Sequence, residues 1–331
     1  MTRGIDFSAG ILAIDPAQTT QHIASALREI ITKQLRRRGV VVGLSGGIDS
    51  SVVAALSAQA LGAERVLGLL MPEIDSSSDS LRLGRLLAES LGIRTITEDI
   101  TPILRGAGCY DRRDRAIRTV VPDYDSGYKC KIVLPDLLQG DRYPVFYAVV
   151  RGPNGMGKKV RLTAEAYLGI VAATNFKQRT RKMMEYYYAD CLQYAVAGTP
   201  NRLEYDQGFF VKLGDGAADV KPIAHLYKSQ VYQLAQYLGV PEEIQQRPST
   251  TDTYALHQSQ EEFYFSLPLR KLDLCLYAKN KGLAAADIAA AVELPAAQVD
   301  RVYRIIDAKR KATRYLHENA LLIEKIPEIH S

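Results

Sequence analysis

The sequence predicts an α/β fold in which a parallel β-sheet is flanked by helices, with a small insertion and a helical C-terminal part. Between residues 16 and 100, short apolar runs typical of buried strands alternate with segments of helical periodicity. That order is the pattern of a parallel sheet with right-handed crossovers, whose ligands bind at the carboxyl ends of the strands. The composition agrees, because 331 residues with 47% apolar and 24% charged side chains are enough for a large core.

The sheet and its first helices follow in order along the chain. Asp15-Pro16 is a plausible helix start, and apolar residues recur behind it with helical spacing. Later runs end at residues that stop a strand or a helix, such as Pro72 and Gly92. We therefore expect strands at 40–44, 65–71 and 94–100 and helices at 16–36, 50–61 and 79–91.

Residues 105–163 break this alternation and are expected to form an inserted subdomain. They are rich in charge, Tyr, Pro and Gly, with strand-like runs at 131–134 and 143–150. Gly152-Pro-Asn-Gly-Met-Gly-Lys158 nearly matches a Walker phosphate loop, but Lys159 stands where Ser or Thr would bind magnesium. The residues that follow alternate like a strand, so we interpret this segment as a hairpin turn.

The second half is expected to be mostly helical. Residues 284–306 have the order of elements found in a helix-turn-helix DNA-binding motif. However, basic residues are sparse there, and Val299, Val302 and Ile306 face one way, which favours a packed helical hairpin. No nucleic-acid binding is expected. We predict helices at 164–174 and 177–191, a buried strand at 194–198 and a C-terminal helical region at 269–319, all within one domain spanning 1–331.

The most informative segment is the loop at residues 43–50, which joins a β-branched strand to a helix. Its small residues and the helix N-terminus predict an anion site, where backbone amides and the helix dipole hold a phosphate. Asp49 suits such a site if a magnesium ion lies between its carboxylate and the phosphate. The loop lacks the Lys of a Walker motif and the spacing of a dinucleotide fingerprint.

Ser45-Gly-Gly-Ile-Asp-Ser50 resembles the signature of the N-type ATP pyrophosphatases, which have a Rossmann-like, adenine nucleotide α-hydrolase-like sheet. Four later segments resemble motifs of NAD synthetases, in the family order, and with the loop they cover about residues 18–104 and 164–315. The chain is therefore identified as a member of the ammonia-dependent NAD synthetase family, since it has no room for a glutaminase domain. The four segments are 175–181, 198–204, 209–219 and 222–228.

The resemblance implies a two-step ligase reaction. ATP would adenylate the carboxylate of deamido-NAD, and ammonia, possibly from a separate glutaminase, would then displace AMP to leave NAD. Ser45, Asp49 and Lys228 would be catalytic, and Asp49 and Glu204 would bind Mg²⁺. The implied ATP-binding residues are Gly43, Leu44, Ser45, Gly46, Gly47, Ile48, Asp49, Ser50, Thr199, Lys228 and Ser249. The implied acceptor-binding residues are Arg179, Lys212, Asp219 and Lys309.

The resemblance also implies a homodimer. The apolar helices around 164–194 are candidates for its interface, although they could simply cover the sheet. The candidate side chains are Tyr167, Leu168, Tyr186, Tyr187 and Leu192.

The sequence departs from the family pattern mainly on the acceptor side. The insertion carries a charged cluster at 111–118, which fits a solvated helix as well as the border of a site. Phe265-Ser266 replaces a family Leu-Gly, and Ala308 replaces a family His. Two alternatives therefore stay open: amidation of a different carboxylate in a secondary pathway, and a non-catalytic nucleotide-binding module.

Charge and cysteine content set the remaining expectations. A net charge of +5 suits an anionic nucleotide substrate. The four cysteines are scattered, which predicts free, mostly buried thiols. No apolar stretch approaches the roughly 20 residues that span a bilayer, and the start lacks a signal-peptide core, so we expect no membrane association and a cytoplasmic location.

Overall fold

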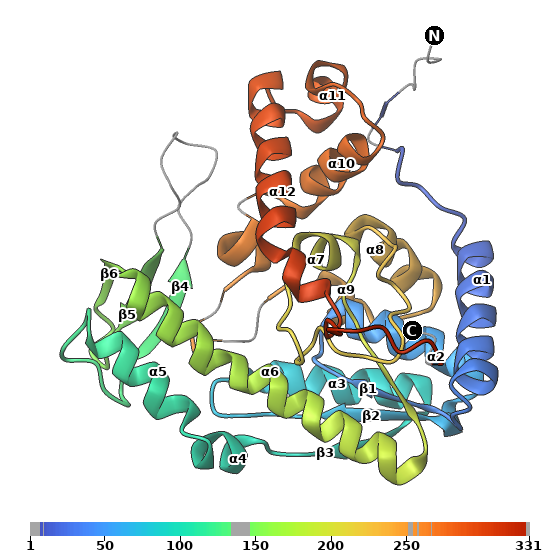
Figure 1. Cartoon of the computed structure of the whole chain (residues 1–331), viewed down its shortest axis with the longest axis horizontal. Helices are drawn as coiled ribbons and strands as arrows, with labels where there is room; N and C mark the ends of the chain where they lie inside the picture. The colour runs from blue at the N-terminus through green and yellow to red at the C-terminus, as the bar shows by residue number, and fades with distance from the viewer. Residues whose placement is uncertain are drawn as a thin grey trace.

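A parallel β-sheet forms the centre of the computed structural model, which describes residues 7–8, 10–133, 146–250, 254–256, 258–265 and 267–328 (Figure 1). Its strand order is β3-β2-β1-β7, and every neighbouring pair is parallel. The predicted parallel sheet with the 40–44 strand inside it is confirmed. The strands are β1 (Val40–Gly43), β2 (Val66–Leu70), β3 (Arg94–Thr97) and β7 (Ala195–Ala197).

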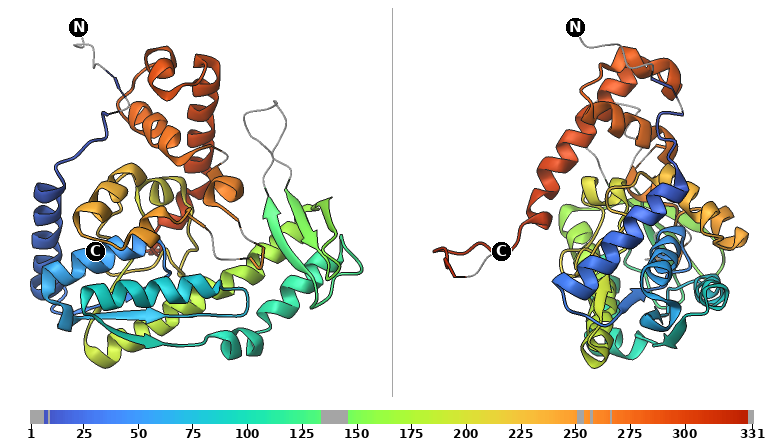
Figure 2. Two further views of the ribbon diagram at one scale, coloured as in Figure 1. Left: turned by 180° about the vertical axis from the view of Figure 1, so that it is seen from behind. Right: turned by 90° about the vertical axis from the view of Figure 1, so that its right-hand side faces the viewer.

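Helices cover both faces of this sheet, as the two opposite views show (Figures 1 and 2). Alternate side chains of β1 point to opposite faces, so Val40 and Val42 join one apolar cluster and Val41 joins another. The first face is covered by α1 (Pro16–Glu29), α2 (Ile48–Leu61), α3 (Ser78–Leu91) and α8 (Lys228–Tyr237). The second is covered by α4 (Thr101–Gly106), α5 (Cys109–Arg118) and α6 (Ala164–Leu192).

Three predicted boundaries need correction. Helix α6 is one continuous helix of 29 residues, so the predicted break between 174 and 177 is wrong. Packing of α6 along α5 and the sheet outweighs the low helix propensity of Asn175. Strand β3 ends at Thr97 because Ile100 already caps α4, and α2 starts at Ile48 because Gly47 is its N-cap.

The predicted insertion contains a separate antiparallel sheet in the order β4-β5-β6. Its strands are β4 (Lys129–Val133), β5 (Tyr147–Arg151) and β6 (Gly157–Arg161). The Walker-like segment is the β5–β6 turn, closed by a hydrogen bond from the Gly152 amide to the Met156 carbonyl at 3.0 Å, so the hairpin prediction is confirmed. The expected strand positions 134 and 143–145 lie outside the described residues.

The C-terminal helices form their own apolar cluster next to the sheet domain (Figure 1). The helical hairpin prediction is confirmed, because Val299, Val302 and Ile306 are buried between the helices. The helices of this part are α10 (Leu269–Asn280), α11 (Ala285–Val292) and α12 (Ala296–His317). Shorter helical segments are Ile30–Gln34, Ala63–Arg65, α7 (Arg202–Gln207), α9 (Glu242–Gln246) and Glu261–Phe265.

Two compositional expectations can be compared with this fold. Within the described part of the chain, none of the helices combines the length and hydrophobicity that crossing a bilayer requires. All four cysteines are free thiols, and three are buried while Cys191 is exposed, as predicted.

Candidate active site

A cavity of about 630 Å³ lies at the carboxyl edge of the parallel sheet. Its walls come from the β1–α2 loop, the end of β2, the segment after β7, and one side of α6. This is the edge at which parallel α/β sheets bind ligands, because the strands there end in loops with free backbone amides.

The β1–α2 loop is held in a tight turn by its own hydrogen bonds. Ser45 and Ser50 pair through their hydroxyls at 3.1 Å, and the Gly47 amide donates to Ser45 Oγ at 3.3 Å. Gly46 has a φ of +71°, and a Cβ there would lie 2.6 Å from the Ser80 carbonyl oxygen, so only glycine fits this turn. Gly46 forms the turn, while the other predicted loop residues, Gly43, Leu44, Ser45, Gly47, Ile48, Asp49 and Ser50, line the cavity.

Asp49, Asn201, Glu204 and Lys228 form the charged centre of the site. The buried ammonium of Lys228 contacts Asp49 Oδ2, and Asn201 donates from Nδ2 to Asp49 Oδ1 at 3.0 Å. The Asn201 backbone amide donates to Glu204 Oε2 at 3.2 Å. Three segments far apart in the sequence, around residues 49, 201–204 and 228, are thus brought together at the N-terminus of helix α2.

Burial and the nearby Asp49 charge raise the pKa of Glu204 to about 8. Burial alone would lower the pKa of Lys228, but the carboxylates of Asp49 and then Glu204 raise it, so Lys228 stays a cation. Lys228 therefore balances the charge of Asp49, while Glu204 keeps its proton at neutral pH.

The donor set fits a magnesium ion. Asp49 and Glu204 offer hard oxygen ligands, and Mg²⁺ is usually held by one or two carboxylates together with substrate phosphates and water. Among the described residues, no three or more His, Cys, Asp or Glu side chains form a group that could hold a metal ion by itself. The two carboxylates would thus supply part of the coordination of the ion, and substrate phosphates and water would supply the rest.

Thr199 and Ser249 line the same cavity as the loop. The Ser249 hydroxyl is buried and has no hydrogen-bond partner among the described residues. A buried polar atom without a partner costs free energy, so a bound ligand would relieve this hydroxyl.

The predicted acceptor residues separate into two pairs. Arg179 and Lys212 line the cavity, and Lys212 Nζ also donates to the carbonyls of Tyr315 and Glu318 at 2.7 and 2.8 Å. Asp219 and Lys309 are not among the cavity's lining residues. Asp219 accepts from the Val196 amide at 2.7 Å, and Lys309 Nζ donates to the Tyr264 carbonyl at 2.6 Å.

Sequence reasoning missed several residues of the site. Asn201 was missed: it forms a capping box on α7 with the predicted Glu204, and the Asn-x-x-Glu spacing could have revealed it. Gln260 Nε2 donates to Glu204 Oε1 at 2.8 Å. Lys182 and Glu185 form a buried pair at 2.5 Å on the cavity wall; their i,i+3 spacing on α6 allows the pair but does not indicate that it is buried.

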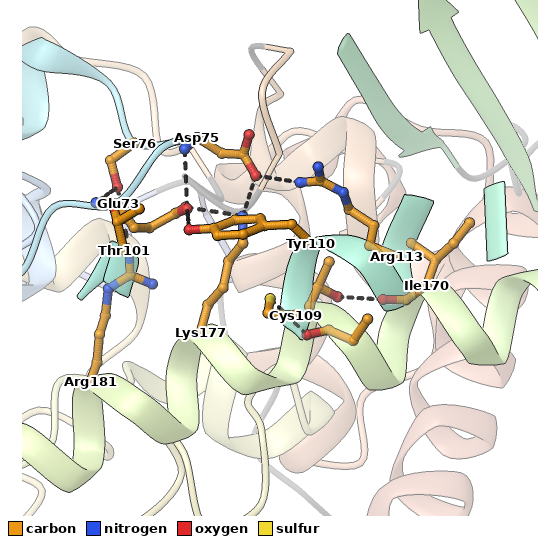
Figure 3. Close-up of polar contacts among 12 residues, drawn as sticks. Glu73, Asp75, Ser76, Thr101, Cys109, Tyr110, Arg113, Ile170, Lys177 and Arg181 are labelled. Carbon is orange, nitrogen blue, oxygen red and sulfur yellow. Dashed lines mark hydrogen bonds and ion pairs between the residues drawn. The ribbon is translucent and has the colours of Figure 1, made fainter. Parts of the chain in front are cut away.

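A second buried network supports the loop between β2 and α3 (Figure 3). Glu73 and Asp75 from this loop meet Lys177 of α6 and Tyr110 and Arg113 of α5. Next to the network lies another cavity of about 1040 Å³, lined in part by Asp75, Tyr110 and Arg113. The charged cluster at 111–118 is thus a helix that borders this cavity.

The chain matches the family model described as NAD synthase over residues 19–116 and 158–314. An NH(3)-dependent NAD(+) synthetase from Rhizobium meliloti (strain 1021) is 59% identical over 323 residues, which cover 98% of this chain and 96% of the relative.

The fold is similar to two solved structures. One is NMN synthetase from Francisella tularensis, with a TM-score of 0.65 and 22% identity over 94% of this chain and 99% of that chain. The other is NH3-dependent NAD synthetase from Campylobacter jejuni, with a TM-score of 0.61 and 22% identity over 94% of this chain and 100% of that chain. Such low identity establishes the fold alone, whereas the family model and the Rhizobium relative show that this chain belongs to the NAD synthase family.

Proposed function

We propose that this protein is an ammonia-dependent NAD synthetase that converts deamido-NAD to NAD at the expense of ATP. The observation that carries the proposal is the 59% identity, over 98% of the chain, to a relative named NH(3)-dependent NAD(+) synthetase. The site geometry supports it, because a phosphate loop, two carboxylates and a buried lysine meet at the carboxyl edge of the sheet.

In the first step, a carboxylate oxygen of deamido-NAD attacks the α-phosphorus of ATP, and the bond to the β-phosphate oxygen breaks to release pyrophosphate. The loop amides and the α2 N-terminus would hold the departing phosphates. Lys228 offsets the charge of Asp49, so the triphosphate can approach this carboxylate with less repulsion. Asp49 and Glu204 would hold Mg²⁺, which when bound offsets negative charge on the triphosphate.

In the second step, the nitrogen of ammonia bonds to the acyl carbon and the bond to the AMP oxygen breaks, with its electron pair leaving on AMP. The nitrogen also loses one proton to water, so the products are the amide, AMP and a proton. Arg179 and Lys212 line the cavity and would orient the acceptor through charge-assisted hydrogen bonds. Ammonia would come from solution or from a separate glutaminase.

A homodimer is part of the proposal. Leu168 and Tyr187 are 63% and 56% exposed on α6, and Met183 between them is 52% exposed. An apolar stripe of this kind on one long helix suits burial against a second copy. The other predicted interface residues, Tyr167, Tyr186 and Leu192, are partly buried.

A second candidate function is amidation of a different carboxylate by the same chemistry. It is favoured by the positions of Asp219 and Lys309, which contact protein groups instead of lining the cavity. The test is to incubate the purified protein with ATP, magnesium, ammonium and deamido-NAD or nicotinate mononucleotide, and to measure products by mass spectrometry. Formation of NAD and AMP from deamido-NAD supports the first candidate; amidation of the mononucleotide alone supports the second. ATP binding without either product would indicate a non-catalytic nucleotide-binding module.

A further inference from the structure

The loop between β2 and α3 forms part of the wall of the candidate ATP cavity. Met71, Pro72, Ser76 and Ser77 line this cavity, next to the phosphate loop. Glu73 and Asp75 lie within the same short segment, and their carboxylates turn away to the helices behind it (Figure 3). The residues that would touch ATP and those that anchor the loop therefore belong to one segment.

The anchor is a compact set of buried charges. Lys177 of α6 is 1% exposed, and its Nζ lies 2.6 Å from Asp75 Oδ2 and 3.0 Å from Glu73 Oε1. The Nη1 atom of Arg113, in α5, lies 2.5 Å from the same Asp75 oxygen. The Tyr110 hydroxyl donates to Glu73 Oε2 at 2.8 Å, and the Asp75 amide donates to that oxygen at 3.1 Å.

This arrangement holds the loop through three side chains from two helices. Helix α5 holds both carboxylates, through Tyr110 and Arg113, and α6 holds both through Lys177. Buried charges of this kind are stable only when each has its partner, so the loop has one favoured position. An ordered loop binds its ligand with less loss of conformational entropy than a loose one.

The position of α5 links these contacts to the candidate ATP cavity. Tyr110, Arg113 and Asp75 line the second cavity, and Ser76 and Ser77 line both cavities. The charged cluster at 111–118 therefore lies directly behind the wall of the ATP site. Its neighbours Arg112 and Arg115 are exposed, whereas the Arg113 side chain is only 12% exposed.

We propose that Tyr110 and Arg113 of α5, together with Lys177, are positioning residues that hold the β2–α3 loop in the conformation that binds ATP. This role rests on the proposed function, because it requires that ATP binds in the cavity lined by the β1–α2 loop. Weakening the anchor lowers the affinity for ATP and leaves the affinity for the acceptor unchanged.

The test uses Arg113→Gln and Tyr110→Phe, each of which removes one contact and leaves Lys177 in place. The matched control is Arg112→Gln, which removes the same charge from an exposed position on the same helix. Arg113→Lys is the conservative variant, since it keeps a cation that can reach Asp75. The measurements are the KM values for ATP and deamido-NAD, kcat, and the Kd of ATP by titration calorimetry without acceptor.

We expect Arg113→Gln to raise both the KM and the Kd for ATP about tenfold, which corresponds to about 1.4 kcal/mol. Tyr110→Phe should raise them about threefold, and Arg113→Lys should recover most of the loss. The KM for deamido-NAD should stay within twofold in every variant, and Arg112→Gln should match the wild type.

Unchanged ATP affinity in Arg113→Gln would overturn the inference, as would an equal rise in both KM values or an equal effect of Arg112→Gln. The calorimetric Kd separates this inference from the proposed function. If the wild type binds ATP but makes no NAD, the proposed function fails while the effect of Arg113→Gln on ATP binding still decides the inference.

Discussion

Replacing Glu204 by Gln should make the protein more stable at neutral pH while abolishing its activity. Glu204 is buried beside Asp49, and these two causes raise its pKa from 4.5 to about 8. Because the folded pKa lies above the unfolded value, the folded state binds more protons between these two values. The Glu204 contribution to stability is therefore fully present below about pH 4.5 and is lost as pH rises through 8.

The size of the effect follows from the same shift. Each pH unit across which only the folded state keeps the proton costs about 1.4 kcal/mol. Between pH 5 and pH 7.5 the wild type should lose about 3 kcal/mol of unfolding free energy that Glu204→Gln keeps. The amide can still accept one of the two hydrogen bonds that Asn201 and Gln260 donate to the carboxylate, so the fold should survive.

The assay is urea unfolding of wild type and Glu204→Gln at pH 5, 6, 7 and 7.5 in EDTA without ATP. We expect the difference in unfolding free energy to grow in favour of the variant as pH rises. Adding magnesium should narrow this difference at pH 7.5, because a cation beside Glu204 stabilises the ionised carboxylate. The reasoning would be refuted if the unfolding free energies of the two proteins changed with pH by the same amount. Glu204 would then titrate alike in the folded and unfolded states.

The remaining predictions concern the catalytic centre and the assembly. Asp49→Asn should abolish AMP formation at constant fold, because it removes one charge that would hold magnesium; near-normal turnover at saturating magnesium would contradict its assignment. Lys228→Met should block pyrophosphate release with any acceptor, whereas Lys212→Met should mainly raise the KM of the acceptor, and side-by-side measurement of pyrophosphate release and ATP affinity tests this division. Gly46→Ala should strain the phosphate loop and weaken ATP binding, since the added Cβ would lie 2.6 Å from a carbonyl oxygen; an unchanged Kd for ATP would contradict this. Light scattering at micromolar protein should give the mass of a dimer, and a monomeric mass would count against the proposed interface on α6.

The sequence was sufficient for the parts of the protein that depend on local pattern. Strand β1, the glycine-rich loop and α2 follow one another within a few residues, so their apolar run, small residues and helical periodicity predicted the phosphate site directly. The β5–β6 turn and the α11–α12 hairpin were predictable for the same reason, because turn residues and apolar spacing are local signals. Roles such as those of Thr199, Ser249 and Asp219 came from ordered family motifs and stay predictions.

Only the tertiary structure decided which distant charges meet. Lys228 and Asp49 are 179 residues apart, and Lys177 and Asp75 are 102 apart, so no sequence period connects either pair. The 111–118 cluster was ambiguous for the same reason: a charged helix looks alike whether its Arg113 faces solvent or a buried carboxylate. Helix α6 was predicted with a break because propensity is a weak local term, while packing along α5 and the sheet keeps it continuous. Local sequence sets which elements form, but burial of charge depends on the path of the whole chain, which places carboxylates from one loop against cations from two helices.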